Sequence, residues 1–447
     1  MTIPENLKGR YAYHFTLFDN LESIIDSGIL CTNQKKHLDI SHKNIAEERI
    51  QGRRSTMPIP CSSGKVVHDY VPFYFSKKTP MQLGVINKKN IDQPLIIYFA
   101  VPIDVIEKIQ GVVFSDASAN TDIPPNFYDS KDVALLQSLN WEAIDSKKWG
   151  CPTEEFRHQK MAELLIPNVV DMRTVAHLVV WNELIKEEVI KVFKAKNKPI
   201  PKIIFGQEHY YINFYDGGQK SIITGPQFLK HNVDVTISEI CKDLKSQTKF
   251  ENIKSAINSI SNDFSIIKEL GDIDGLKASY GPHSDDVGTH SRKVATTVKT
   301  MPEYNSLSKE NKEIVLLSAY LHDIGKGPKS RWGDKGMERA DNDHAVKSLP
   351  MLKRILTEDI GSLDRELVRK IVMLVTYDDL IGDIVAKGRS EQQLFNIIES
   401  EEELNMIIAL GKADMISINP MWVFLNEHKI KALKLKAIDA LECKEPC

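Results

Sequence analysis

Apolar and polar positions follow different patterns in the two halves of the chain. In the first 225 residues, short apolar runs rich in β-branched and aromatic side chains predict strands over 71–76, 95–101 and 164–167. Brief polar segments separate these runs. Strands that alternate with short helices are typical of a mixed α+β domain.

Two local signals add detail to this half. Apolar spacing predicts a helix over 21–29, with Asn20 as its N-cap and Gly28 at its end. A hairpin is predicted over 210–223, because the Asp-Gly-Gly sequence at 216–218 supplies a turn with positive φ angles.

The pattern becomes helical from about Thr236. Apolar residues recur at helical spacing between Ile253 and Ile267, and strand signals become scarce. We therefore predict a mixed domain over 1–225, a helical connector over 226–270 and an all-α domain over 271–447.

Composition supports two soluble domains. A chain of 447 residues exceeds what one core usually organises. No apolar run reaches the length of a membrane span, and the N-terminus lacks the apolar core of a signal peptide. Six cysteines without a CxxC pair argue against a zinc knuckle and a disulfide framework. We expect a cytoplasmic protein without a membrane partner.

Charge is balanced overall and concentrated locally. The net charge of −3 excludes a globally basic nucleic-acid protein. The segment from Lys35 to Lys89, however, contains eleven lysines and arginines and only four acidic residues, a surplus of seven positive charges. Such a segment could bind a phosphate backbone, or it could be a solvated loop.

The first half also contains residue types suited to breaking a sugar–nitrogen bond in a dinucleotide. His14 and Thr16 alternate on a short predicted strand, so both face one side and can grip ribose and carboxamide. Glu163 is a lone carboxylate before the apolar run LLIP, where it can stabilise a cationic sugar or accept a proton. Three arginines offer forked donors for phosphate oxygens: Arg49, Arg53 and Arg54.

Three motifs in this half occur in a known order: YHFTLFDNLESIIDSGIL from Tyr13, HDYVPFYFSKKTPM from His68, and EEFRHQKMAELLIP from Glu154. Over roughly residues 10–225 the chain resembles the DarT family of DNA-targeting ADP-ribosyltransferase toxins. The resemblance implies a compact ADP-ribosyltransferase fold, NAD as donor, and a base in single-stranded DNA as acceptor. Thymidine is favoured over guanosine. It also implies an antitoxin or phage-defence partner.

The resemblance also assigns roles. Glu163 falls at the catalytic position, and Arg49 and Arg54 compete for the catalytic arginine, with Arg49 favoured. The positions that it places at the NAD-binding edge are His14, Phe15, Thr16, Asn20, Leu21 and Arg49.

A second group of candidate residues lies in the helical half. His322 and Asp323 stand together in AYLHDIGKG, and Asp414 lies in GKADMIS. Imidazoles and carboxylates suit divalent transition metals, which can activate water for attack on phosphate. His290 and His344 supply further imidazoles.

Over about residues 280–420 this H…HD…D pattern resembles the HD-domain metal phosphohydrolases. The resemblance implies one metal site, with His290, His322, Asp323 and Asp414 as ligands. Where such proteins with two metals often have another histidine, this chain has the sequence Tyr377-Asp378-Asp379. His344 and Asp378 would complete a looser second site, and Lys326 is either a phosphate contact or a solvated helix cap.

Three functional hypotheses follow. The preferred one is an NAD-dependent DNA ADP-ribosyltransferase fused to an HD domain that hydrolyses a phosphate-containing substrate or the adduct. The alternative is a metal-dependent nucleotide phosphohydrolase whose N-terminal domain senses nucleotide or DNA. A non-catalytic DNA-binding adaptor is disfavoured, because it would leave the carboxylate and the metal ligands without a role.

Overall fold

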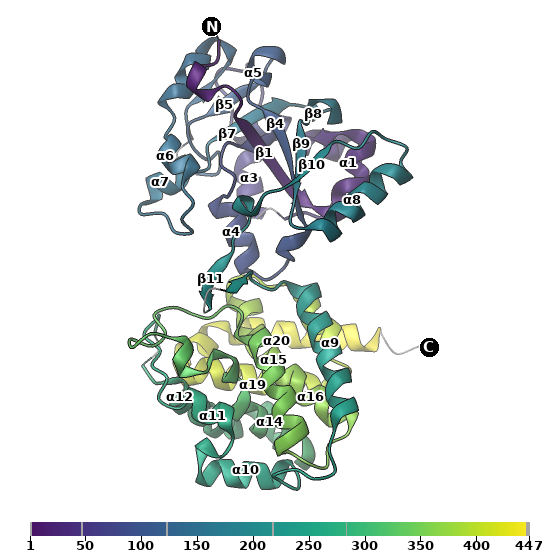
Figure 1. Cartoon of the computed structure of the whole chain (residues 1–447), viewed down its shortest axis with the longest axis vertical. Coiled ribbons are helices and arrows are strands. Elements are labelled where there is room, and N and C mark those ends of the chain that lie inside the picture. Colours follow the sequence, from purple (N-terminus) through teal and green to yellow (C-terminus); the bar gives the residue numbers. More distant parts are fainter. Residues whose placement is uncertain (1, 46–47, 122–123, 217–218, 283, 444–447) are drawn as a thin grey trace. The chain divides into compact units, whose positions relative to one another are not determined.

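The chain folds into two compact units (Figure 1). The computed structural model describes residues 2–45, 48–121, 124–216, 219–282 and 284–443, without the side chains of 48–49, 213–216 and 219–221. Unit 1 comprises Met1–Asn87 and Ile91–Asn213, and unit 2 comprises Lys88–Asn90 and Phe214–Cys447. Unit 1 mixes strands and helices while unit 2 is mostly helical, so both predicted fold classes are confirmed.

A single mixed sheet forms the centre of unit 1. Its strand order is β10-β9-β4-β1-β3-β7-β5-β6, and a separate small sheet pairs β2 with β8. The predicted strands correspond to β3, β4 and β7. The strand bounds are β1 Tyr11–Leu17, β2 Ile29–Leu30, β3 Tyr70–Tyr74, β4 Ile96–Pro102, β5 Val113–Ser115, β6 Phe127–Tyr128, β7 Glu163–Pro167, β8 Val169–Val170, β9 His177–Val180 and β10 Lys202–Phe205.

Short helices surround this sheet. Their bounds are α1 Leu21–Ser27, α2 Thr32–His37, α3 Glu48–Thr56, α4 Pro80–Asn87, α5 Val105–Lys108, α6 Trp141–Asp145, α7 Glu154–Gln159 and α8 Glu183–Ala195. The sheet face that carries Phe73, Phe99 and Leu164 packs into the main core together with Leu21 of α1 and Phe193 of α8. The opposite face carries aromatic residues, among which Phe15 stacks on Tyr74 with ring centroids 6.1 Å apart.

The sheet opens between β1 and β3. Strand β1 pairs with β4 along its whole length, from Tyr11 opposite Pro102 to Leu17 opposite Ile96. Among the described residues, the register between β1 and β3 contains one pair, Tyr13 with Tyr74. Pro72 explains the opening, because it has no N–H to donate across this seam. We call the gap between the two strands the seam.

Unit 2 is built from helices α9 to α20 and a small hairpin. Helix α14 packs against α12, α16 and α19, and Leu317, Leu374 and Leu410 are completely buried there. The bounds are α9 Pro226–Asp243, α10 Ile253–Asn262, α11 Lys268–Ile273, α12 Val287–Thr297, α13 Pro302–Asn305, α14 Lys309–Leu321, α15 His344–Arg354, α16 Arg365–Thr376, α17 Leu380–Gly382, α18 Gln392–Ile397, α19 Glu401–Ile418 and α20 Pro420–Glu442, with π-helical turns at Ile355–Asp359 and Asp383–Lys387.

The segment 226–270, expected as a connector, packs within unit 2. Leu229 of α9 and Ile257 of α10 belong to the same core as the later helices. The predicted hairpin forms from β11 (Asn213–Asp216) and β12 (Gln219–Ser221), and its glycine turn at 217–218 lies outside the described residues.

Residues 88–90 interrupt the sequence of unit 1 and belong to unit 2. The Asn90 side-chain amide donates to the carbonyl oxygen of Gly388 at 2.9 Å, and its Oδ1 accepts from the Ser390 N–H at 2.7 Å. Gln393 donates to the carbonyl oxygen of Lys89 at 2.9 Å. Among the helices that the structure describes, none has both the length and the apolar character needed to cross a bilayer.

Candidate functional sites

A fully buried ion pair joins Glu163 to Arg54. Glu163 begins β7 and is completely inaccessible to solvent, and Arg54 of α3 is 6% exposed. The two guanidinium nitrogens Nη1 and Nη2 donate to Oε1 and Oε2 of Glu163, each at 2.8 Å. This fork-to-fork geometry fixes both side chains. The carboxylate expected beside an apolar run is thus held by an arginine from 109 residues earlier in the chain.

Helix α3 brings Arg54 to this position. It packs on the short 3-10 turn Val67–Asp69, which leads directly into β3. Burial opposes the charged form of Arg54, but the Glu163 carboxylate more than offsets this, and the pKa of Arg54 is raised. Arg49 lies five residues earlier on the same helix, about 140° away around its axis. Its side chain lies outside the described residues, so the choice of Arg49 or Arg54 as the catalytic arginine stays a prediction.

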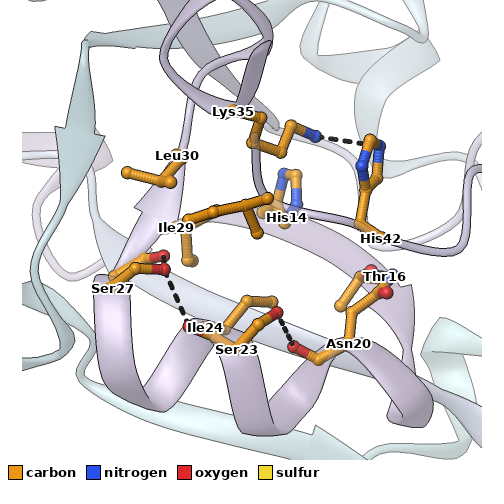
Figure 2. Close-up of a pocket in the computed structure, with 12 residues that line it drawn as sticks. His14, Thr16, Asn20, Ser23, Ile24, Ser27, Ile29, Leu30, Lys35 and His42 are labelled. Atoms are coloured by element: carbon orange, nitrogen blue, oxygen red, sulfur yellow. Dashed lines mark hydrogen bonds between the residues drawn. The ribbon is translucent and has the colours of Figure 1, made fainter. Parts of the chain in front are cut away.

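A narrow pocket contains most of the other residues expected to contact NAD. His14, Thr16 and Asn20 line it, together with Lys35 of α2 and His42 (Figure 2). The pocket continues along α1 toward Gly28, which ends that helix with a φ angle of 76°. His14 and Thr16 face one side as predicted.

Phe15 and Leu21, also expected to contact NAD, lie elsewhere. Phe15 points to the opposite sheet face against Tyr74 and Tyr98. Leu21 is completely buried in the main core of unit 1. Neither lines the pocket, because neighbouring strand residues alternate between faces and the first turn of α1 turns Leu21 inward.

The surroundings of His14 determine which of its ring nitrogens faces a ligand. Its Nδ1 lies 2.9 Å from the carbonyl oxygen of Pro72 across the seam. A carbonyl oxygen only accepts, so Nδ1 carries the proton and Nε2 is left as an acceptor. Burial lowers the pKa of His14 to about 4, so the ring is neutral near pH 7. A neutral acceptor suits a ribose hydroxyl or an amide N–H.

The prediction that Asn20 caps α1 with its side chain is wrong. Asn20 precedes α1, but its side chain does not cap the helix. Its Nδ2 donates to Thr16 Oγ1 at 2.9 Å and to the Lys43 carbonyl oxygen at 3.0 Å, and its Oδ1 accepts from the Lys43 N–H at 2.8 Å. Asn20 therefore ties the pocket strand to the basic loop that follows α2.

The Arg54–Glu163 pair and the pocket lie on different faces of the sheet. Tyr13, Tyr74 and Glu163 stand in one row across β1, β3 and β7. Alternation then places His14 on the other face, two strands or about 10 Å from Glu163. Across the seam, Phe15 stacks on Tyr74 on the Glu163 face, and His14 contacts the Pro72 carbonyl oxygen.

Unit 2 contains a compact cluster of imidazoles and carboxylates. Helix α14 ends at Leu321, and His322 and Asp323 follow directly at its C-terminal end. His290 Nε2 lies 2.8 Å from Asp414 Oδ1 and 3.9 Å from Asp323 Oδ2, and His322 Nε2 lies 3.8 Å from Asp414 Oδ1. All four expected ligands are thus brought together, from α12, the end of α14 and α19.

A second group adjoins the first through Asp323. His344 Nε2 lies 3.4 Å from Asp378 Oδ2, 3.8 Å from Asp379 Oδ2 and 4.0 Å from Asp323 Oδ1. The two oxygens of Asp323 therefore face different groups. Sequence reasoning named His344 and Asp378 but missed Asp379, although two adjacent carboxylates after an apolar helix were a usable signal.

Backbone contacts orient both imidazoles. The Nδ1 atoms of His322 and His344 lie 2.9 and 2.8 Å from the carbonyl oxygens of Ala319 and Asp341, so each Nε2 faces the carboxylates. Gly325, two residues after Asp323, permits close packing. A Cβ there would lie 1.9 Å from the carbonyl oxygen of His344.

This donor set fits metal ions. His322 Nε2 and Asp378 Oδ1 are buried and have no hydrogen-bond partner among the described residues, which is costly unless another group binds them. Imidazole nitrogens with carboxylate oxygens suit divalent transition metals. Three overlapping groups of possible ligands each keep their donor atoms within 4.8 Å of one another: His290–His322–Asp414, His322–Asp323–Asp378 and His344–Asp378–Asp379.

Unit 1 is thus a mixed-sheet domain with a buried Arg–Glu pair on β7, and unit 2 is a helical domain with a cluster of metal-binding residue types. Residues 13–212 match the family model described as ssDNA thymidine ADP-ribosyltransferase, DarT, and residues 287–408 match the HD domain. The chain therefore contains a DarT-family domain followed by an HD domain, and both resemblances are confirmed.

Individual relatives match the N-terminal part. The DNA ADP-ribosyl transferase of Thermus sp. (strain 2.9) is 29% identical over 205 residues, which is 44% of this chain and 95% of that relative. The DNA ADP-ribosyl transferase of Thermus aquaticus is 28% identical over 182 residues, 40% of this chain and 78% of the relative. A solved structure of Thermus sp. 2.9 DarT with ADP-ribosylated ssDNA aligns at 28% identity and a TM-score of 0.42, covering 47% of this chain and 99% of that one.

Proposed function

We propose that the N-terminal domain transfers ADP-ribose from NAD to a base in single-stranded DNA, with thymidine favoured and guanosine as the alternative base. The observation that carries the proposal is the buried Arg54–Glu163 pair beside a seam that His14 reaches from the other side. The relatives named as DNA ADP-ribosyl transferases support the acceptor class.

The reaction assigns a task to each group. The bond between the nicotinamide nitrogen and C1 of the ribose breaks, and nicotinamide leaves with the bonding electron pair. Glu163 stabilises the positive charge that develops on the sugar, because a carboxylate in a dry site interacts strongly with it. A ring nitrogen of the base then bonds to C1, and the proton that it loses passes to Glu163. His14 and Thr16 hold the donor, and Arg54 orients the carboxylate.

Mass analysis of oligonucleotides tests this proposal. The full chain with NAD should add the mass of one ADP-ribosyl group to a thymine-containing single strand and release nicotinamide. Glu163→Gln should abolish both products. A guanine-only strand identifies the alternative base. Unchanged masses on every strand with wild type would exclude the transferase.

We infer that the HD domain is a metal-dependent phosphohydrolase. His290, His322, Asp323 and Asp414 would hold one ion, and His344 and Asp378 with Asp379 would hold a second. A bound divalent ion supplies activation of water and neutralisation of phosphate charge. We propose that Lys326, whose Nζ lies 2.7 Å from Asp323, contacts a phosphate of the substrate.

The second candidate function is tested with the same preparation. If phosphate release depends on added Mn²⁺, stops with chelator and is lost in Asp323→Asn, while no DNA is modified, the chain is a nucleotide phosphohydrolase with a sensing N-terminal domain. An antitoxin or phage-defence partner stays a prediction. Expression of Asp323→Asn beside wild type tests whether the HD domain protects the cell, because a protective domain makes the variant more toxic.

A further inference from the structure

A second cavity of unit 1 lies beside the Glu163 row. It has a volume of about 380 Å³ and lies between the segment that follows β3 and the end of α6. Ser76, Lys77 and Lys78 form one wall, Asp145 and Lys147 form another, and Glu208 completes it. We call this cavity the lysine pocket.

The lysine pocket has unneutralised positive charge. Its two carboxylates are already paired, Glu208 with Lys77 at 3.0 Å and Asp145 with Arg10 at 2.8 Å. Among the described residues, no carboxylate lies within ion-pair distance of Lys78 or Lys147. The Lys78 ammonium donates to the Lys147 carbonyl oxygen at 3.1 Å. Burial, and then the neighbouring Lys147 charge, lower the pKa of Lys78.

A further lysine, Lys160, contacts the segment that carries Asp145 on one side of the pocket. Lys160 is 1% exposed, and its ammonium donates to the carbonyl oxygens of Ala143 and Ser146. Burial lowers the pKa of Lys160 to about 8, and in the part of the chain that the structure describes it forms no ion pair with a carboxylate. Clustered ammonium groups without counter-charges disfavour one another, and an anion would remove that cost.

The pocket begins next to the residue proposed to act on the sugar. Tyr74 pairs with Glu163, and the Phe75 N–H donates to the Ala162 carbonyl oxygen at 3.2 Å, so the ladder continues by one residue. Ser76 lies two residues beyond the end of β3, at most roughly 7 Å further along the chain. Glu208 of the pocket precedes His209, whose ring contacts Tyr13 in the same row as Glu163. The lysine pocket thus adjoins the face that carries Glu163, and His14 lies on the other face.

We propose that the lysine pocket binds a backbone phosphate of the acceptor DNA strand, next to the nucleotide whose base is modified. The proposal rests on the proposed transferase function. Because Glu163 is proposed to take the proton of the incoming base, the acceptor must approach on the face that carries Glu163, whereas the donor is assigned to the His14 side. A phosphate held near Glu163 would place the adjoining base at the seam. Such a contact is independent of base identity and gives register along the strand.

The test is the salt dependence of DNA binding. For full-length wild type, the affinity for a thymine-containing oligonucleotide is measured between 50 and 200 mM salt, without NAD, roughly the range over which phosphate contacts weaken visibly. Each phosphate contact with a single strand contributes about 0.7 to the slope of log affinity against log salt. Lys78→Gln with Lys147→Gln should reduce the slope by about 0.7. Lys194→Gln with Lys198→Gln, which removes two exposed lysines on another part of unit 1, is the matched control and should leave the slope unchanged.

Two further measurements keep the outcomes separate. Lys78→Arg with Lys147→Arg retains both charges and should restore the wild-type slope, which excludes misfolding as the cause. NAD affinity of the Gln double variant should equal that of wild type. An unchanged slope overturns the proposal. If NAD binding is weakened at the same time, the pocket holds the donor pyrophosphate and not a DNA phosphate. If wild type binds DNA with this lysine-dependent slope but modifies no base, the pocket stands and the transferase proposal fails.

Discussion

Removing one partner of the Arg54–Glu163 pair should strongly destabilise unit 1. In Glu163→Leu the Arg54 guanidinium, 6% exposed, would lose both carboxylate oxygens that accept its hydrogen bonds. Breaking a buried ion pair from one side typically costs about 3–5 kcal/mol, because the remaining charge is uncompensated. For a domain of this size about 1 kcal/mol lowers the melting temperature by roughly 2–4 °C. We therefore expect unit 1 to melt about 6–20 °C lower.

Calorimetry of the full chain without NAD measures this effect, since a bound ligand would itself raise the melting temperature. Arg54→Met should cause a loss similar to that of Glu163→Leu. The double variant removes both charges and should recover most of the stability, giving a coupling energy of about 2 kcal/mol or more. Two single variants that each cost less than about 1 kcal/mol, with coupling near zero, would refute the reasoning, because the pair would then be solvated. Activity comparisons with Glu163 variants should accordingly be made well below the lowered melting temperature.

Three other predictions concern the candidate sites and the pH dependence. Arg54→Lys keeps the charge but loses the fork, so transfer to DNA should fall by about 10²-fold or more, whereas Arg49→Lys should cost less than roughly tenfold; equal losses in steady-state rates would contradict the assignment. Burial lowers the pKa of His14 and His209 to about 4, so on acidification the unfolded chain binds protons first, and unit 1 should lose about 1.4 kcal/mol per histidine per pH unit from pH 6.5 to about 4. Denaturant melts at pH 7, 6 and 5 check this, and a flat profile would speak against it. Metal analysis after Mn²⁺ loading should find two ions per chain in wild type and one in Asp378→Asn; two ions in the variant would remove Asp378 from the second site.

The sequence predicted elements and local motifs better than long-range geometry. β3, β4 and β7 were foreseen, because an apolar strand buried between neighbours is visible as a run. His14, Thr16 and Asn20 were found together, because seven residues of chain contain all three. Neither result required knowledge of which strands pair.

Features that depend on packing between distant segments could not be foreseen. The sequence around Arg49 and Arg54 does not distinguish the two arginines. The orientation of α3 on the turn before β3 directs Arg54 toward Glu163. The opposite faces of His14 and Glu163 follow from a register that no local pattern specifies. Asp379 shows a different limit. Two adjacent carboxylates after an apolar helix were visible in the sequence. The closeness of Asp379 to His344, however, depends on where α15 begins.

The assignment of residues 88–90 to unit 2 has a consequence for synthesis on the ribosome. The hydrogen bond from Asn90 to Gly388 cannot form until Gly388 has been synthesised, 298 residues later. At about 5–20 residues per second this delay lasts roughly 15–60 s. During that interval the nascent chain carries every strand of the first sheet, while the loop that leaves α4 has no place to dock. If residues 1–213 were produced alone, residues 88–90 would lack their hydrogen-bond partners at 388–393. Neither unit can therefore be produced from one continuous segment of chain without losing these contacts.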